Sequence, residues 1–260
     1  MDLSEVHTRE IEMLKYFNSF CKSNNLLYMI DGGTLLGSIR HGGFIPWDDD
    51  VDVIMMRSQY ERLKSLGEKF ENENYRLLFI ENTSDYYYPF IKMIDKRTKL
   101  IEYNLQEIEE LGLFIDVFPI DNLPNSKLKK TLFIKSMGIV RRLRTTNAQL
   151  STVTSNKIKK IFFPIVKKIS IRFLAKVLDK FSQKYNSEKS SECANLVGNP
   201  RENFFSNSWF QHIDYSKFES LNLPIPGNYI AYLEVNYGDY MKLPPVEQRI
   251  NHGLNIIKRH

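Results

Sequence analysis

The sequence predicts an α/β protein in which a mixed β-sheet is flanked by helices. Apolar residues recur at helical spacing over residues 4–24. Short apolar runs such as "LLYMID" (26–31) and "LFIDVFPID" (113–121) instead have the length of buried strands. Apolar residues make up 42% of the 260-residue chain, which is enough to bury a sizeable core.

The expected elements alternate between helix and strand through the first half of the chain. The expected helices are 4–24, 32–40, 58–72, 126–149 and 156–186, the last interrupted at Pro164. The expected strands are 26–31, 50–55, 76–80, 87–95 and 113–121. Thr34 is expected to be the N-cap of the helix at 32–40.

Charge divides the chain into segments of different character. Residues 127–189 contain seventeen Lys or Arg and two acidic residues, whereas the rest of the chain is acidic on balance. We therefore expect an α/β core at 1–125, a basic helical segment at 126–190 and a less regular C-terminal segment at 191–260.

The N-terminus and the cysteines suggest a cytoplasmic protein. Residues 1–13 carry charges where a signal peptide needs an apolar run. Cys21 and Cys193 are the only cysteines, and they lack the spacing of metal ligands. No segment reaches the roughly 18 uninterrupted apolar residues of a membrane-spanning helix. Peripheral contact with the inner face of the membrane stays open.

Aspartates occupy four of the five positions 48–52, directly before an apolar run. In a strand, Asp50 and Asp52 would point to the same face. Neighbouring carboxylates repel each other unless a cation neutralises them, and Mg²⁺ or Mn²⁺ prefers such oxygen ligands. The pair is therefore either a metal site, with Asp48 as a further ligand, or the solvated face of an edge strand.

Asp116 is the expected third carboxylate. It stands alone among apolar residues of the strand at 113–121, so it is either a metal ligand or a hydrogen-bonded aspartate of the core. Asp121 has a loop-like context and suits this role less well.

A glycine turn precedes these acids. Gly32, Gly33 and Thr34 follow the strand at 26–31 and open a helix. Paired glycines let the backbone approach a ligand, and a helix N-terminus attracts phosphate. The turn is either a phosphate cradle or an ordinary strand–helix connection. Combined with paired carboxylates, it favours metal-assisted attack on the phosphate of a nucleotide.

The stretch "DGGTLLGSIRHGGFIPWDDDVDV" (31–53) closely resembles the signature of the LicD family, which also includes the fukutin-like proteins. The stretches "FIDVFPID" (114–121) and "YGDYMKLPP" (237–245) are similar to the same family, so the resemblance covers most of the chain. It implies a nucleotidyltransferase-like catalytic core at 1–125 and a C-terminal segment that completes the site.

The resemblance also implies roles for individual residues. Asp50 and Asp52 match the metal-binding pair of the family, and Asp116 matches its third acid. Residues 32–34 match the turn on the phosphate side.

The reaction is likewise implied by the resemblance. LicD-type members transfer phosphocholine from CDP-choline to a hydroxyl of a cell-surface glycan precursor, and fukutin-like members transfer ribitol phosphate from CDP-ribitol. The expected function is therefore phosphocholine transfer to a lipid-linked precursor of teichoic acid or lipopolysaccharide, with release of CMP. Transfer of ribitol, glycerol or ethanolamine phosphate is the alternative within the enzyme class. A non-catalytic nucleotide- or choline-binding module at the membrane is the alternative outside it.

Three cationic residues are candidates for binding phosphate. Arg40 and His41 end the helix that follows the glycine turn, and a guanidinium offers two parallel donors to phosphate oxygens. An ordinary surface position at a helix end is the alternative. Lys92 lies on an otherwise apolar strand, so its charge requires an acid or a phosphate.

A choline donor would require an aromatic cage, because its quaternary ammonium offers no hydrogen-bond donor. Trp47 is the first candidate, since it lies beside the acids, and Tyr87 and Tyr88 are further candidates. Aromatic residues are frequent throughout the chain, so proximity alone does not assign them. Arg249 and His252 are candidates for closing the site.

The basic segment is expected to be amphipathic. Residues 156–181 interleave Lys or Arg with Ile, Phe and Leu, a pattern typical of helices that bind an anionic membrane surface. The alternative is that the apolar face packs on the core and leaves the cations in solvent. Nucleic acid is not an expected partner, because the sequence contains no recognised nucleic-acid motif.

Overall fold

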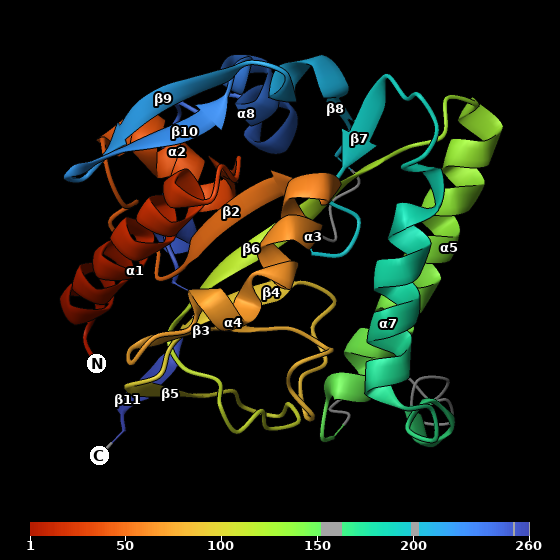
Figure 1. Cartoon of the computed structure of the whole chain (residues 1–260), viewed down its shortest axis with the longest axis horizontal. Coiled ribbons are helices and arrows are strands. Elements are labelled where there is room, and N and C mark those ends of the chain that lie inside the picture. Colours follow the sequence, from red (N-terminus) through yellow and green to blue (C-terminus); the bar gives the residue numbers. More distant parts are fainter. Residues whose placement is uncertain (152–162, 199–202, 252, 260) are drawn as a thin grey trace.

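A mixed sheet of seven strands forms the centre of the protein. The computed structural model describes residues 1–151, 163–198, 203–251 and 253–259. Helices cover the sheet, and a helical pair stands beside it (Figure 1). The predicted class, a mixed sheet flanked by helices, is confirmed.

The order of the strands brings the acidic residues together. The main path is β1 (Met29–Ile30), β2 (Val51–Met56), β6 (Phe114–Asn122), β4 (Ile91–Asp95) and β3 (Tyr75–Leu78), while β7 (Glu192–Ala194) pairs with β6 and β8 (Phe205–Ser206) pairs with β7. Strands β2 and β6 are parallel, and their register places Asp52 opposite Asp116. Strand β4 is antiparallel to β6 and places Lys92 on the other side of Asp116.

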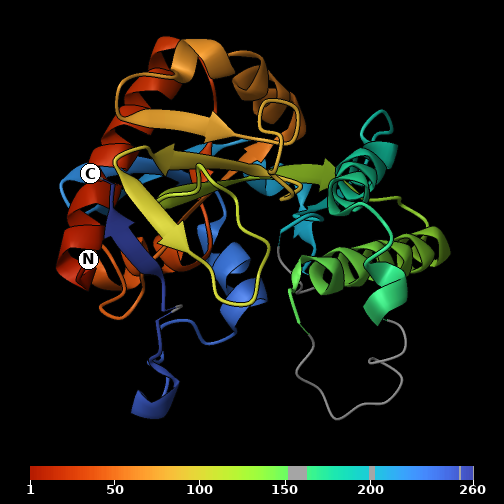
Figure 2. The same ribbon diagram turned by 90° about the horizontal axis from the view of Figure 1, so that it is seen from below.

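Within the described ranges, the helices that pack around this sheet are α1 (Leu3–Ser23), α2 (Gly32–His41), α3 (Arg57–Ser65), α4 (Gly67–Phe70) and α8 (Tyr229–Tyr237). Helices α3 and α4 lie on one side of the sheet and α8 on the opposite side (Figure 2). Asp2 caps α1, because its side chain accepts a hydrogen bond from the backbone N–H of Glu5. The single helix expected at 58–72 is divided between α3 and α4, and the division falls beside Gly67, a residue with low helix propensity.

The basic segment forms two packed helices, α5 (Lys127–Ala148) and α7 (Ile171–Ser182), beside the sheet (Figure 1). The apolar face of α7 is buried, and it consists of Ile171, Leu174, Ala175 and Leu178. For α7, the structure therefore shows the arrangement in which the apolar face packs inside the protein. Residues 152–162, which include the start of the expected helix at 156–186, lie outside the described ranges.

Arg57 connects the helical pair to the sheet. Its Nε and Nη2 donate to the two carboxylate oxygens of Asp121 in β6, at 2.8 and 2.6 Å. Its Nη1 donates to Asp179 of α7 at 2.7 Å. Asn186 adds a further hydrogen bond to Asp121 at 2.6 Å. Asp121 is fully buried in β6 rather than in a loop, because this network compensates its charge.

The C-terminal segment returns to the core through short strands. It contains the hairpin β9 (Ile213–Phe218) and β10 (Leu221–Pro226), and its last strand β11 (Asn255–Lys258) pairs with β5 (Thr98–Ile101). Short 3₁₀ helices η1 (Gln183–Tyr185), η2 (Asn207–Phe210) and η3 (Val246–Gln248) connect the remaining elements. Within the described residues, no helix combines the length and the apolar composition that crossing a bilayer requires.

Candidate active site

A cavity of about 960 Å³ opens where β2 and β6 meet the start of α2, α8 and residues 239–250. The predicted site residues that line it are Gly32, Gly33, Arg40, Trp47, Asp48, Asp50, Asp52 and Asp116. The sequence pattern therefore identified most of one wall of this cavity.

Two hydrogen bonds, one between backbone groups and one to a side chain, connect the glycine turn to the acidic strand. The N–H of Asp31 donates to the carbonyl of Asp52, and the N–H of Asp52 donates to the hydroxyl oxygen of Thr34, both at 2.9 Å. The expectation that Thr34 caps α2 is wrong, because Asp31 occupies the N-cap position and Thr34 lies inside the helix. Thr34 is buried, and its hydroxyl oxygen accepts the hydrogen bond that positions Asp52.

Both glycines make room for carboxylates. A Cβ atom at Gly33 would lie 2.2 Å from Oδ2 of Asp48, and a Cβ at Gly32 would lie 2.8 Å from Oδ2 of Asp52. Gly32 also has a positive φ of 53°, which L-residues with side chains rarely adopt. The turn therefore lets two acidic side chains approach the start of α2.

The carboxylates of Asp31, Asp50, Asp52 and Asp116 form the acidic wall of the cavity, and they disfavour one another's ionisation. Burial and the negative charges of Asp50, Asp116 and Asp31 raise the pKa of Asp52 well above its usual value. Burial likewise raises the pKa of Asp31, although hydrogen bonds from Tyr232 and from the N–H of Gly32 oppose this effect. Asp121 differs from Asp52, because Arg57 donates two hydrogen bonds to Asp121 whereas the carboxylates around Asp52 act against its ionisation.

Lys92 contacts Asp116 without reaching the cavity. It is buried, it donates to Oδ1 of Asp116 at 2.6 Å, and its Nζ lies 3.3 Å from the centroid of the Phe114 ring. It is not among the residues that line the cavity. Burial raises the pKa of Asp116 to about 6, and Lys92 limits this rise. The lysine therefore has the acidic partner that its position in a strand required.

The donor chemistry of the acidic wall fits a hard divalent cation. Asp50, Asp52 and Asp116 offer carboxylate oxygens to one cavity, and their mutual repulsion would be relieved by a cation placed among them. Over the described ranges, no three His, Cys, Asp or Glu side chains converge on a single point as ligands of one ion. The residues thus fit the cation by their type and charge, and binding would require the carboxylates to draw together.

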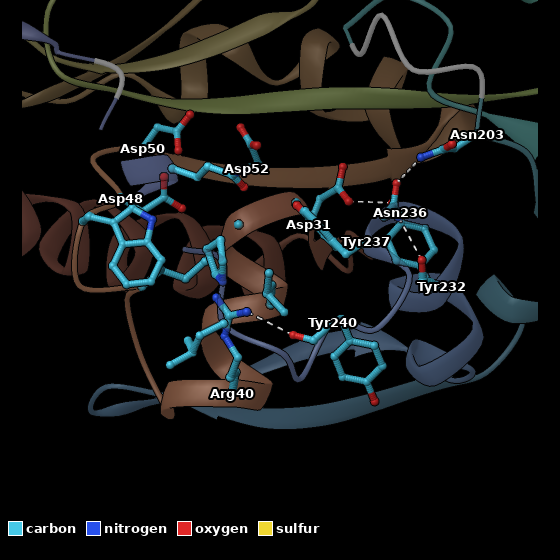
Figure 3. A pocket seen from close by; sticks show the side chains of 18 of the residues that line it. Asp31, Arg40, Asp48, Asp50, Asp52, Asn203, Tyr232, Asn236, Tyr237 and Tyr240 are labelled. Atoms are coloured by element: carbon cyan, nitrogen blue, oxygen red, sulfur yellow. Dashed lines mark hydrogen bonds between the residues drawn. The ribbon is translucent and has the colours of Figure 1, made fainter. Parts of the chain in front are cut away.

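A cationic side chain faces the acids across the cavity. Arg40 lies opposite Asp50 and Asp52, and its Nη1 donates to the backbone carbonyl of Tyr240 at 3.0 Å (Figure 3). Lys242 lines the same cavity. Burial lowers the pKa of Arg40, as does the positive charge of Arg249. The cavity therefore combines carboxylates with guanidinium and ammonium groups.

Trp47 carries a cation on its ring face. The Cζ atom of Arg249 lies 5.2 Å from the Trp47 ring centroid, and the Nε of Arg249 donates to the carbonyl of Pro244 at 3.0 Å. The exposed ring of His41 is edge-on to Trp47, at 6.4 Å between centroids, without lining the cavity. His252 lies outside the described residues.

The structure does not bring the predicted tyrosines to this cavity. Tyr87 donates its hydroxyl to the carbonyl of Gln106 and Tyr88 donates to Glu102, both at 2.7 Å. Neither residue is among those that line the cavity. An aromatic cage built from Trp47, Tyr87 and Tyr88 therefore does not form in the described structure, because these hydrogen bonds hold the tyrosines outside the cavity.

Several lining residues were missed by the sequence reasoning. Asp31 lies 2.5 Å from the hydroxyl of Tyr232, which donates to its Oδ1, and both residues line the cavity. Asp31 stands directly before the paired glycines, so its position in the signature could have revealed it. Asn203 donates to Asn236 at 2.7 Å at the far end of the cavity, and no local pattern marks these two residues (Figure 3).

The fold and the site define an enzyme of the nucleotidyltransferase type, with strand carboxylates beside a glycine turn. Residues 25–141 match the family model described as LicD/FKTN/FKRP, nucleotidyltransferase domain. The chain is 30% identical over 250 residues to the lipopolysaccharide cholinephosphotransferase LicD of Haemophilus influenzae, with 94% of this chain and 93% of that protein covered.

Two shorter similarities agree with this match. The human and mouse proteins named ribitol 5-phosphate transferase FKRP are each 43% identical over 42 residues, which is 16% of this chain and 8% of those proteins. An uncharacterised protein of Rickettsia prowazekii is 35% identical over 68 residues, 26% of each chain. The chain belongs to the LicD family of transferases.

Proposed function

We propose that this protein transfers phosphocholine from CDP-choline to a hydroxyl of a lipid-linked glycan precursor, at the cytoplasmic face of the membrane. The observation that carries the proposal is the wall of carboxylates around Asp52, which shares one cavity with Arg40. Such an arrangement suits a nucleotide diphosphate together with a divalent cation. The full-length similarity to a cholinephosphotransferase favours phosphocholine as the transferred group.

Asp50, Asp52 and Asp116 are the residues that would hold Mg²⁺ or Mn²⁺. When bound, the ion would offset the negative charge of the diphosphate and polarise the phosphate under attack. Arg40 and Lys242 would bind diphosphate oxygens, since they bring positive charge into the same cavity. The glycine turn supports this arrangement by keeping Asp48 and Asp52 close to the start of α2.

Asp116 is the proposed proton acceptor. Its carboxylate lines the cavity beside Asp52, where it would accept the proton of the acceptor hydroxyl. The hydroxyl oxygen then attacks the phosphorus nearest choline, the bond from that phosphorus to the bridging oxygen breaks, and CMP leaves with the electron pair. Arg40, which lines the same cavity, would offset the charge that develops on the leaving phosphate.

Trp47 is the proposed contact for the choline ammonium. Its ring lines the cavity and already has a guanidinium stacked on it, so its face accepts a cation. On this proposal the donor's ammonium competes with Arg249 for the ring.

Calorimetric titration tests this function. CDP-choline is titrated with and without Mg²⁺, beside CDP-ribitol, CDP-glycerol and CDP-ethanolamine, into the wild type and Trp47→Leu. We expect metal-dependent binding of CDP-choline by the wild type, weakened roughly tenfold in Trp47→Leu, because one cation–π contact to a partly desolvated ligand contributes about 1–2 kcal/mol.

The alternatives give different results. Stronger binding of a donor with a neutral alcohol, unaffected by Trp47→Leu, would support a transferase whose transferred group is not phosphocholine. Metal-independent binding of CDP-choline without CMP release would favour a non-catalytic binding module. Binding of none of the four donors would contradict the proposal as a whole.

A further inference from the structure

Helix α5 has a second apolar stripe that faces solvent. Leu128, Leu132 and Ile139 are 70%, 60% and 59% exposed. Spacings of four and seven residues place their side chains on one face of the helix. The buried side chains Phe133, Ile134 and Met137 lie on the opposite face. The exposed stripe is therefore not part of the packing between α5 and α7.

Cations surround this stripe. Lys135 and Arg142 lie on the same face as the three apolar residues, and Lys127 and Lys129 lie beside its first turn. Through their side chains, these four cations form no hydrogen bond or ion pair with any described residue. Helix α5 contains no Asp or Glu. Its other cations are engaged: Lys130 contacts Glu192, Arg141 donates to the carbonyl of Leu196, and Arg144 donates to the carbonyl of Tyr87.

We propose that this outward face of α5 docks the protein on an anionic lipid bilayer. A helix with an apolar stripe between rows of cations lies in the plane of the interface, with the stripe among the acyl chains and the cations near the headgroups. The docking face is on α5, since the apolar face of α7 is buried. This surface is separate from the cavity, so the inference does not depend on which donor the cavity binds.

The composition of the face argues against other occupants. Nucleic acid would use the cations but would gain nothing from three exposed aliphatic side chains. A second copy of the same face would bring Lys135 and Arg142 of both copies together, and like charges would repel. An anionic bilayer is the partner that uses both the apolar and the cationic residues.

The test is co-sedimentation of the whole protein with vesicles at low salt. One set contains phosphatidylcholine with about 30% phosphatidylglycerol, and the other contains phosphatidylcholine alone. The variants are Leu132→Asp/Ile139→Asp and Lys135→Glu/Arg142→Glu. Tyr215→Asp is the matched control, because Tyr215 is also exposed, at 57%, but lies on β9. Circular dichroism confirms that each variant is folded, and titration with CDP-choline reports the cavity separately.

We expect the wild type and Tyr215→Asp to sediment with anionic vesicles and not with neutral ones. Both α5 variants should bind at least roughly tenfold more weakly, since one loses two apolar side chains from the acyl region and the other replaces two cations with anions. Their CDP-choline affinity should equal that of the wild type. Failure of the wild type to bind anionic vesicles would overturn the proposal, as would equal binding by the α5 variants. A change of oligomeric state in the α5 variants would also overturn it. So would a loss of binding by these variants when a short DNA duplex replaces the vesicles in the assay.

Discussion

Two clusters of charged residues lie on strand β6, and they are held by opposite means. Near the end of the strand, Asp121 receives two hydrogen bonds from Arg57 and a third from Asn186. Earlier in the same strand, Asp116 shares a cavity with Asp52, whose pKa is raised by burial and by neighbouring carboxylates. The first cluster is compensated by the fold itself. In the second, Lys92 pairs with Asp116, but burial and the neighbouring carboxylates still raise the pKa of Asp52, so a bound cation would relieve repulsion there.

This difference predicts that removing a charge has opposite effects in the two clusters. In the acidic wall, the change should abolish function without a loss of stability. In the Arg57 network, removing a charge should lower the free energy of unfolding.

The largest effect is expected for Asp52→Asn. The substitution removes a charge with little change of shape, and we expect CMP release from CDP-choline in the presence of acceptor to fall by at least about 100-fold. The free energy of unfolding at pH 7 should not decrease, because a carboxylate whose folded-state pKa is raised destabilises the fold when it is ionised. Urea unfolding and a CMP-release assay measure the two quantities. Near-normal release would refute the assignment of Asp52 to the site.

Arg57→Ala should cause the largest loss of stability. It leaves Asp121 buried without its cation, and breaking a buried pair in this way costs about 3–5 kcal/mol. Urea unfolding is the measurement, with Arg142→Ala as the control, because Arg142 is exposed and has no side-chain partner among the described residues. A loss below about 1 kcal/mol would show that the network is not what holds α7 to the sheet.

The glycine turn offers a smaller and more local test. Gly32→Ala should lower stability by about 1–3 kcal/mol, since it forces a side chain into a left-handed conformation and against Asp52. Gly138→Ala in α5 is the matched control, because its Cβ meets no atom within 4 Å and the change should be neutral or stabilising. Equal effects of the two substitutions in urea unfolding would contradict the close approach described here.

The smallest effect concerns a second compensated carboxylate, Asp95. Burial raises its pKa, but hydrogen bonds from Arg97 and Arg9 outweigh burial and hold the pKa below its usual value. A lowered folded-state pKa contributes stability above the unfolded value of about 3.9, and this contribution is lost as pH falls through the folded-state pKa. Asp95→Asn should therefore cost about 1–2 kcal/mol at pH 7 and much less near pH 3. Unfolding curves at the two pH values measure this, and a pH-independent difference would contradict it.

Much of the fold was accessible from local pattern. The helical spacing at 4–24 predicted α1 because one of its faces is apolar, and the apolar run at 113–121 predicted β6. The ends of helices and their capping residues were harder to predict from local pattern. The N-cap assigned to Thr34 belongs to Asp31, since Thr34 instead accepts a hydrogen bond from Asp52, a residue eighteen positions away.

The residues of the candidate site likewise divide into those that the sequence predicted and those that it did not. Asp50, Asp52 and Asp116 were identified because carboxylates beside apolar strands need a physical reason, and all three line the cavity. Tyr87 and Tyr88 were chosen for being aromatic, but their hydroxyls bond to Gln106 and Glu102 outside the cavity. Tyr232 and Asn236 reach the cavity from α8, about two hundred positions beyond the glycine turn, and carry no local signal.

The sequence by itself determined the family, the α/β class and the acids of the site, because these depend on residue types at short spacings. The tertiary structure decided which charges are compensated. Lys92 meets Asp116 and Arg57 meets Asp121 through strand register and helix packing. It also decided which face of the basic segment is exposed, since α5 and α7 bury one apolar face each against the protein, and the outer stripe of α5 is left in solvent. Spacing along the chain does not encode these pairings, because they join residues tens of positions apart.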